Sequence, residues 1–148
     1  MTYKASFQKM TLFESVPPTR RLLMSKVRSK DTQPEVALRQ YLHSLGYRYR
    51  LHQANLPGSP DIVFGSRKRA IFVHGCFWHR HYLCSRSTTP KTRKEFWEAK
   101  FRANIERDAR NISELDRLGW KIMVVWECET FDLGTLHPKL VEFLGTRA

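Results

Sequence analysis

The segment HGCFWHRHYLC, residues 74–84, holds three histidines, two cysteines and three aromatic side chains in eleven positions. Imidazole and thiol groups can bind metal ions or act as catalysts. Cys76, His81 and Cys84 lie within nine residues of one another. Cys128, after the last long apolar run, completes three thiolates and one imidazole, the closed tetrahedral ligand set of a structural zinc ion. The alternative is that the cysteines are small buried residues and that His81 is a surface histidine.

Asp61, His74 and His79 are candidates for a hydrolytic site. Asp61 precedes one short apolar run, His74 ends the next, and His79 lies in the loop beyond it. If these runs pair as strands, the carboxylate and the histidine converge, and they suit Mg²⁺ binding and proton transfer from an attacking water. From the residues alone, Asp61 could equally be a turn residue and His74 a hydrogen-bonded strand-end histidine. Glu35 is ambiguous too, because Thr32-x-x-Glu35 fits a capping box at a helix start.

Phe77 and Trp78 lie between a candidate metal ligand and a candidate base. Packing in the core is the ordinary role of such side chains. A metal-braced loop on a basic protein could instead insert them between base pairs, as in proteins that kink DNA. Trp97, near the start of a long helical pattern, could join them or pack against the sheet.

Charge is the strongest signal in the composition. The chain has 26 Lys and Arg against 14 Asp and Glu, a formal net charge of +12. This excess favours binding to a polyanion such as nucleic acid, although a solvated basic surface would give the same count. The N-terminus lacks the apolar region of a signal peptide, and no apolar run approaches the ~18 residues of a membrane span. We therefore expect a cytoplasmic protein, in which reduced thiols are available for metal.

The length of 148 residues predicts one domain. Residues 1–22 are expected to form a loose arm that ends at Pro17-Pro18, and residues 23–148 the folded domain. Apolar periodicity and breaker residues predict helices at 31–46, 91–118 and 137–144 and strands at 47–51, 62–64, 70–73 and 120–126. A short turn between the second and third strands favours a hairpin, and the long helix favours a parallel crossover. The order predicts an α/β fold around a mixed sheet.

With these residues assembled, the chain resembles the very short patch repair (Vsr) DNA mismatch endonucleases. The resemblance runs from about Met24 to Cys128 through SKVRSKDTQPE, LPGSPDIVF, IFVHGCFWHRH, RKEFWEAKF, N-x-x-R-D (Asn104 to Asp108) and GWKIMVVWEC. It implies a restriction-endonuclease-like fold, a mixed central sheet flanked by helices, with structural zinc and catalytic Mg²⁺. It also implies nicking on the 5′ side of the thymine in a T·G mismatch, the product of 5-methylcytosine deamination.

The resemblance assigns a role to each candidate catalytic residue. Asp61 takes the place of the Mg²⁺-binding aspartate, and Val73 supplies a metal-ligating main-chain carbonyl. Glu35 falls on a glutamate that supports the water shell of the metal. His79 matches the histidine proposed to activate water, and His74 the one that assists at the scissile phosphate.

Zinc ligands and DNA-contacting residues are implied in the same way. The zinc ligands are Cys76, His81, Cys84 and Cys128. The aromatic residues that intercalate beside the mismatch are Phe77, Trp78 and Trp97, and the residues that insert from the opposite groove are Met24 and Val27. Two features depart from the best-studied member: Val73 replaces a threonine, and the loop from His81 to Cys84 is one residue longer.

Two other functions remain open at this level. One is a Vsr-like nuclease of a restriction–modification system that cuts matched sites. The other is a zinc-stabilised DNA-binding module without catalysis, which the set of Asp61, His74 and His79 disfavours. The expected partner is double-stranded DNA with a T·G mismatch, with other mismatch-repair proteins as further candidates. A monomer is expected, because one nick needs one active centre.

Overall fold

The computed structural model of the chain describes residues 30–146. The predicted arm, residues 1–22, and the two predicted DNA-contacting residues Met24 and Val27 lie outside the described residues. The elements are α3 (Gln33–Ser44), β1 (Arg50–Leu51), β2 (Ile62–Phe64), the 3-10 turn η1 (Gly65–Arg67), β3 (Arg69–His74), α4 (Lys94–Arg117), β4 (Lys121–Trp126), the 3-10 turn η2 (Glu127–Phe131) and α5 (Leu133–Leu144).

The four strands form one mixed sheet in the order β1-β2-β3-β4. β2 and β3 are antiparallel and are joined by η1, where Lys68 adopts a left-handed φ of 51°. β3 and β4 are parallel, and their register ends with His74 opposite Trp126. The predicted hairpin and the predicted parallel crossover are therefore confirmed. This register brings the ends of β3 and β4 to the same edge of the sheet.

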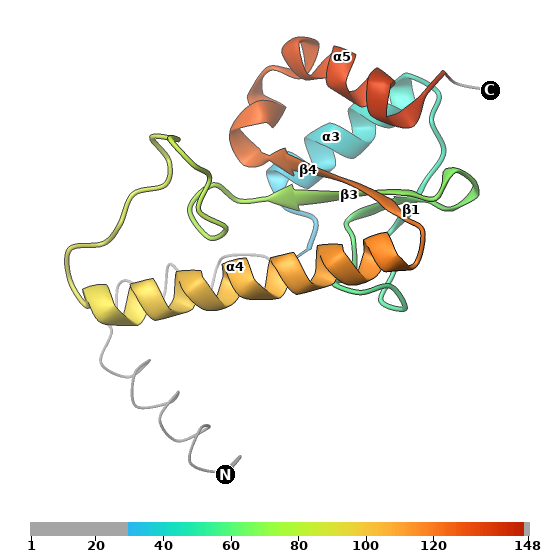
Figure 1. Cartoon of the computed structure of the whole chain (residues 1–148). Coiled ribbons are helices and arrows are strands. Elements are labelled where there is room, and N and C mark those ends of the chain that lie inside the picture. Colours follow the sequence, from blue (N-terminus) through green and yellow to red (C-terminus); the bar gives the residue numbers. More distant parts are fainter. Residues whose placement is uncertain (1–29, 147–148) are drawn as a thin grey trace.

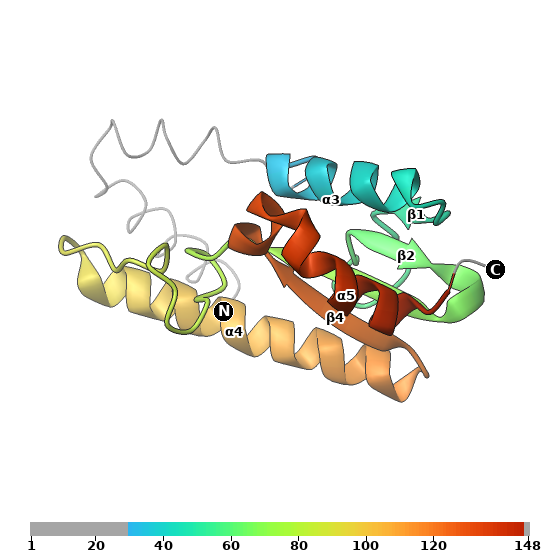
Figure 2. The ribbon, with the colours of Figure 1, turned by 90° about the horizontal axis from the view of Figure 1, so that it is seen from above.

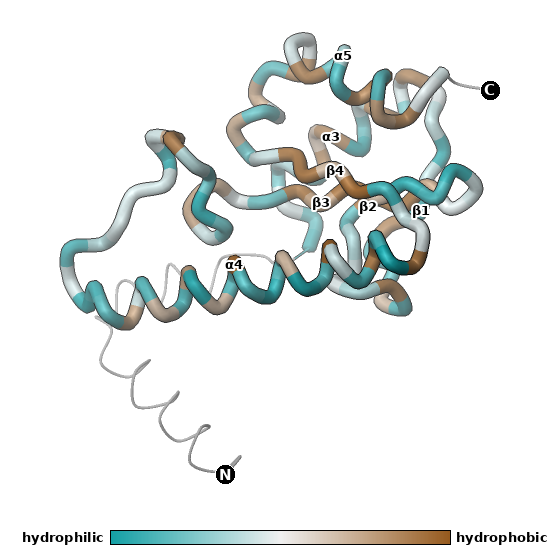
Figure 3. The backbone as a smooth tube through the Cα atoms, viewed as in Figure 1, coloured by the Kyte–Doolittle hydropathy of each residue, from teal (hydrophilic) through white to brown (hydrophobic). Residues whose placement is uncertain are grey.

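Helices cover both faces of this sheet (Figure 1). α3 and α5 lie next to each other on one face of the sheet (Figure 2). A hydrogen bond of 2.7 Å between the Tyr41 hydroxyl and His137 Nδ1 joins them. α4 runs along the other face, and its first half projects beyond the strands (Figure 1). The buried core lies between the sheet, α3 and α5, where hydrophobic residues gather (Figure 3); it comprises Leu38, Leu42, Tyr47, Ile62, Phe64, Ile71, Val125, Leu136, Leu140 and Leu144.

Relative to their lengths, β1 and α5 differ most from their predicted extents, and the bounds of the other predicted elements agree within three residues. β1 covers only Arg50–Leu51 rather than residues 47–51. β2 ends at Phe64 and continues into η1, so in the register that pairs Arg50 with Val63, residues 47 and 48 have no strand opposite them. The hydroxyls of Tyr47 and Tyr49 donate instead to the carbonyls of Gly145 and Arg39 at 2.6 Å. α5 begins at Leu133 rather than at residue 137, because the carboxylate of Asp132 caps it by accepting from the Thr135 N–H.

Candidate active site and metal cluster

A groove of about 1010 Å³ lies between the start of α3, the end of β3 and one side of α4. Each of these elements contributes polar side chains to its wall. The residues predicted to be catalytic, Glu35, Asp61, His74 and His79, all line it, and so does Val73, whose carbonyl was predicted to bind Mg²⁺. The fold thus brings together residues that span 45 positions of sequence, which is the geometry that a single site requires.

Asp61 is fixed at the floor of this groove, directly before β2. Its Oδ2 accepts a hydrogen bond of 2.7 Å from the Val73 N–H, which ties the carboxyl group to the end of β3. Burial raises the pKa of Asp61 to about 7; the hydrogen bond from Val73 opposes this shift, and the nearby Glu35 carboxyl adds to it. The anion is therefore costly here unless positive charge accompanies it.

Glu35 takes part in hydrogen bonds at the start of α3 and also lines the groove. The Thr32 hydroxyl accepts from the Glu35 N–H at 3.4 Å, as predicted for a helix cap. Glu35 Oε2 accepts at 3.1 Å from the N–H of Asp31 rather than from that of Thr32, so the predicted capping box is displaced by one residue. Burial raises the pKa of Glu35. A second buried carboxyl group thus lies near Asp61.

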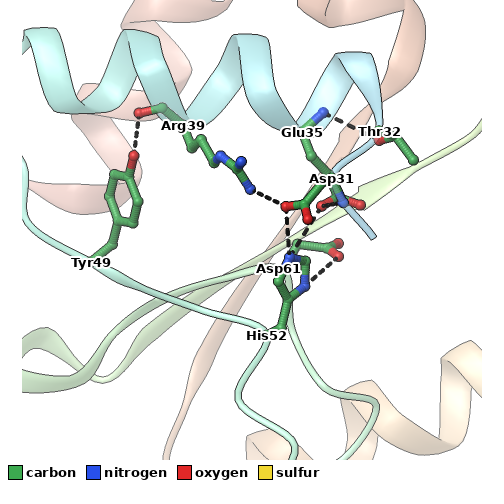
Figure 4. A network of polar contacts seen from close by, with 7 residues as sticks. All are labelled: Asp31, Thr32, Glu35, Arg39, Tyr49, His52 and Asp61. Carbon is green, nitrogen blue, oxygen red and sulfur yellow. Dashed lines mark hydrogen bonds and ion pairs between the residues drawn. The ribbon is translucent and has the colours of Figure 1, made fainter. Parts of the chain in front are cut away.

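His52 lies among these acidic groups (Figure 4). Its Nε2 is 3.6 Å from both Glu35 Oε2 and Asp31 Oδ1, and its Nδ1 is 3.9 Å from Asp61 Oδ1. Its backbone has a left-handed φ of 48°. The Arg39 guanidinium donates a hydrogen bond of 2.6 Å to Asp31 Oδ1. No local sequence pattern points to His52, because its neighbours come from α3 and from the start of β2.

His74 and His79 form a stacked pair that also lines the groove. Their ring centroids are 3.9 Å apart and their planes differ by 7°. Burial, followed by the charge of His79, lowers the pKa of His74 to about 4, so His74 is neutral near pH 7. His79 Nδ1 is hydrogen-bonded to the carboxylate of Asp108 on α4. An Nδ1–H that donates to a carboxylate leaves the lone pair on Nε2, which is the tautomer of a general base.

The four predicted zinc ligands also meet. The ligand atoms of Cys76, His81, Cys84 and Cys128 all lie within 4.8 Å of one another. His81 Nδ1 is 3.6 Å from the Cys76 sulfur and 3.4 Å from the Cys128 sulfur. A tetrahedral zinc ion with ligands at about 2.3 Å (S) and about 2.0 Å (N) places such atoms roughly 3.5 Å apart. Burial raises the pKa of Cys76 to about 12, so its thiolate needs a cation. We call these four residues the Cys/His cluster.

The aromatic residues of the loop pack around α4. Phe77 contacts Trp97 and Phe101 edge-on, with centroids 5.6 and 5.2 Å apart. Trp97 is buried, with 2% of its surface exposed, whereas Phe77 and Trp78 are half-buried. Trp78 alone of the three lines the groove, and its carbonyl accepts from the Asn104 side chain at 3.0 Å. Of these three aromatic residues, only Trp78 therefore presents a surface to the groove.

Comparisons with known proteins agree with this geometry. The family model described as "DNA mismatch endonuclease Vsr" matches residues 14–86. The chain is 52% identical over 128 residues to the type II nicking enzyme V.XorIIP of Xanthomonas oryzae pv. oryzae, covering 86% of this chain and 93% of that one. It is 44% identical over 110 residues to the DNA mismatch endonuclease Vsr of Escherichia coli, covering 74% and 70%. The chain belongs to the Vsr family. It is a DNA endonuclease.

The fold of this Vsr-family chain is also found among solved structures. The catalytic domain of the homing endonuclease I-Bth0305I superposes with a TM-score of 0.53 at 21% identity, over 76% of this chain and 94% of that domain. The predicted α/β nuclease fold is thus confirmed. Within residues 30–146, no helix combines the length and the hydrophobicity that a membrane crossing demands.

Asp108 is a residue of the site for which the sequence predicted no role, although it belongs to the motif N-x-x-R-D. The Vsr-family motif N-x-x-R-D places Asn104 and Asp108 four residues apart, on one side of α4. Asn104 binds the loop at Trp78 and Asp108 binds it at His79. In the sequence, the only sign of these contacts is that two polar residues lie four positions apart in the middle of a predicted amphipathic helix.

Proposed function

We propose that this Vsr-family endonuclease nicks the thymine-carrying strand of a T·G mismatch on the 5′ side of the thymine, in a Mg²⁺-dependent hydrolysis. The observation that carries the proposal is the composition of one groove: the carboxyls of Asp61 and Glu35, the His79–Asp108 pair and the ring of Trp78 all face it. A duplex bound in this groove would contact the hydrolytic groups and the aromatic side chain over the same few base pairs. The Escherichia coli relative is named a mismatch endonuclease.

Asp61, the Val73 carbonyl and Glu35 are the residues that would hold Mg²⁺. They fit the ion because Asp61 is tied to Val73 at 2.7 Å and because both carboxyl groups are buried with raised pKa values. Oxygen ligands of this kind are those that Mg²⁺ prefers. When bound, the ion supplies positive charge that stabilises the developing charge on phosphate and leaving oxygen.

His79 acts as the general base in this proposal. Asp108 fixes the His79 ring and directs its lone pair to Nε2, which takes a proton from the attacking water. His74, neutral and stacked on His79, donates a hydrogen bond towards the scissile phosphate. Water attacks phosphorus while the bond to the 3′ oxygen breaks, which leaves a 5′-phosphate and a 3′-hydroxyl.

The Cys/His cluster binds structural Zn²⁺ in this proposal and holds the loop that carries Phe77 and Trp78. Three thiolates and one imidazole within 4.8 Å of one another support this, because they match the number and type of ligands in a tetrahedral structural zinc site. A T·G wobble pair costs less to unstack than a Watson–Crick pair, so insertion of these aromatic residues favours mismatched DNA. Trp97 contributes to the same wedge if it leaves the packing that buries it in this structure. Met24 and Val27 are proposed to insert from the opposite groove.

Nicking assays on matched and T·G duplexes with varied flanking sequence, with and without Mg²⁺, test the proposal. Nicking only beside T·G supports it. Cleavage of matched duplexes at a fixed site supports a restriction function instead, a second candidate favoured by the names of relatives such as V.XorIIP, a type II nicking enzyme. Membership of an endonuclease family argues against the remaining alternative, a zinc-stabilised DNA-binding module without catalysis. The proposal includes action as a cytoplasmic monomer, with other mismatch-repair proteins as candidate partners.

A further inference from the structure

A series of aromatic rings connects the Cys/His cluster with the histidine pair of the groove. His81 stacks on Trp126, with centroids 4.3 Å apart and planes that differ by 9°. Trp126 meets His74 edge-on at 5.4 Å and 74°. His74 in turn stacks on His79 at 3.9 Å. The Trp126 ring thus contacts a candidate metal ligand and, through its other contact, a candidate catalytic residue.

The backbone fixes Trp126 in this position. It is the last residue of β4, and the parallel register pairs it with His74, the last residue of β3. Its N–H donates to Glu129 Oε1 at 3.0 Å, within the turn η2 that also carries Cys128. The backbone therefore fixes the point at which the Trp126 side chain leaves the sheet, between His81 and His74.

We propose that Trp126 is a positioning residue that couples the geometry of the Cys/His cluster to the stacked pair His74 and His79. The orientation of His81 follows from its contacts with the Cys76 and Cys128 sulfurs, and Trp126 passes that orientation to His74 by direct ring contact. The cluster thus aligns the hydrolytic histidines in addition to bracing the loop. This inference rests on the proposed roles of these two histidines.

Two simpler arrangements predict different results. If Trp126 only fills space at the edge of the core, its replacement lowers stability without a specific change at the histidines. If the cluster positions His79 only through the two-residue backbone link from His79 to His81, the ring of Trp126 makes no difference. The chain offers a matched control in Trp120, which precedes the other end of the same strand and contacts Lys68 rather than the site.

The variants Trp126→Leu, Trp126→Phe and Trp120→Leu in the full chain test the proposal. The first readout is the position of the His74 and His79 ring signals in ¹H–¹³C spectra, recorded with Zn²⁺ bound, after its removal by a chelator and after its return. We expect these signals to shift with Zn²⁺ in the unsubstituted chain, in Trp126→Phe and in Trp120→Leu, and to respond much less in Trp126→Leu. This readout is independent of nicking, so it holds even if the proposed substrate is wrong.

The second readout separates binding from catalysis. At saturating T·G duplex, Trp126→Leu is expected to nick about 10- to 100-fold more slowly, the usual cost of losing a partner of a functional ligand, with its DNA affinity and bound Zn²⁺ retained. Trp126→Phe, which keeps an aromatic ring, recovers most of the rate. The proposal is overturned if Trp126→Leu responds to Zn²⁺ like the unsubstituted chain, or if Trp120→Leu loses as much activity.

Discussion

The Cys/His cluster and the groove both gather potential metal ligands at the end of β3, but they differ in ligand chemistry and in access. The cluster combines three sulfurs and one nitrogen within 4.8 Å, a number that completes a tetrahedron. The groove offers carboxyl oxygens that would fill only part of the coordination sphere of a hard cation, in a space of about 1010 Å³. A complete set of soft ligands suits a permanent ion, and a partial set of hard ligands suits an exchangeable ion beside substrate.

The largest effect that separates these regions is expected from Asp61→Asn. The amide keeps the size of the side chain and can still accept from the Val73 N–H, but it removes the charge that a cation requires. We expect a loss of about 10³-fold in nicking rate, equivalent to about 4 kcal/mol of transition-state stabilisation. Single-turnover nicking and binding of labelled T·G duplex measure the two effects. A folded variant that loses DNA binding as well would contradict the role assigned to Asp61.

Cys128→Ser tests the other region. Loss of one thiolate should lower Zn²⁺ affinity by at least about 10²-fold, since even partners of metal ligands contribute 10- to 100-fold. The melting temperature of the unsubstituted chain should fall after a strong chelator has removed its Zn²⁺ in a prolonged incubation, whereas that of the variant should hardly change. Ser85→Ala, a substitution between Cys84 and Arg86, is the control. Full Zn²⁺ retention by Cys128→Ser would show that Cys128 is not a ligand.

Asp108→Asn sharpens the comparison within the groove. The amide no longer favours the Nδ1–H tautomer of His79, so Nε2 carries the lone pair that accepts the proton in a smaller fraction of molecules. We expect a rate about 10²-fold lower, within the range of general-base contributions. The Mg²⁺ concentration for half-maximal nicking should stay unchanged, because Asp61 and Glu35 are intact. A change in that concentration as large as the change in rate would place Asp108 with the metal ligands instead.

A smaller effect follows from the raised pKa of Asp61, which is about 7 because the group is buried. Below that pH the carboxyl is protonated, and a proton competes with a cation for the same oxygens. The Mg²⁺ concentration for half-maximal nicking should therefore rise by up to about tenfold per pH unit below 7 and level off above it. Nicking rates over a grid of pH and Mg²⁺ concentration measure this. A requirement that is flat from pH 5.5 to 8 contradicts the assignment.

The two regions also differ in how far the sequence could predict them. Three of the four residues of the Cys/His cluster lie within nine positions, so spacing alone indicated it. His52 and Asp108 escaped prediction because their partners, Glu35 and His79, lie 17 and 29 positions away, and only the packing of α3 and α4 brings them together. Periodicity predicted each strand of residues 30–146, but it overextended β1, because alternation indicates which side chains face inward and not where the partner strand β2 ends.

The most direct test of the distinction between a permanent and an exchangeable ion is elemental analysis of the purified chain, combined with a nicking assay before and after brief treatment with EDTA. We expect about one zinc ion per chain to survive the treatment, and we expect EDTA to stop nicking and Mg²⁺ alone to restore it. Protein without firmly bound zinc, or scission that continues in EDTA, would contradict this distinction.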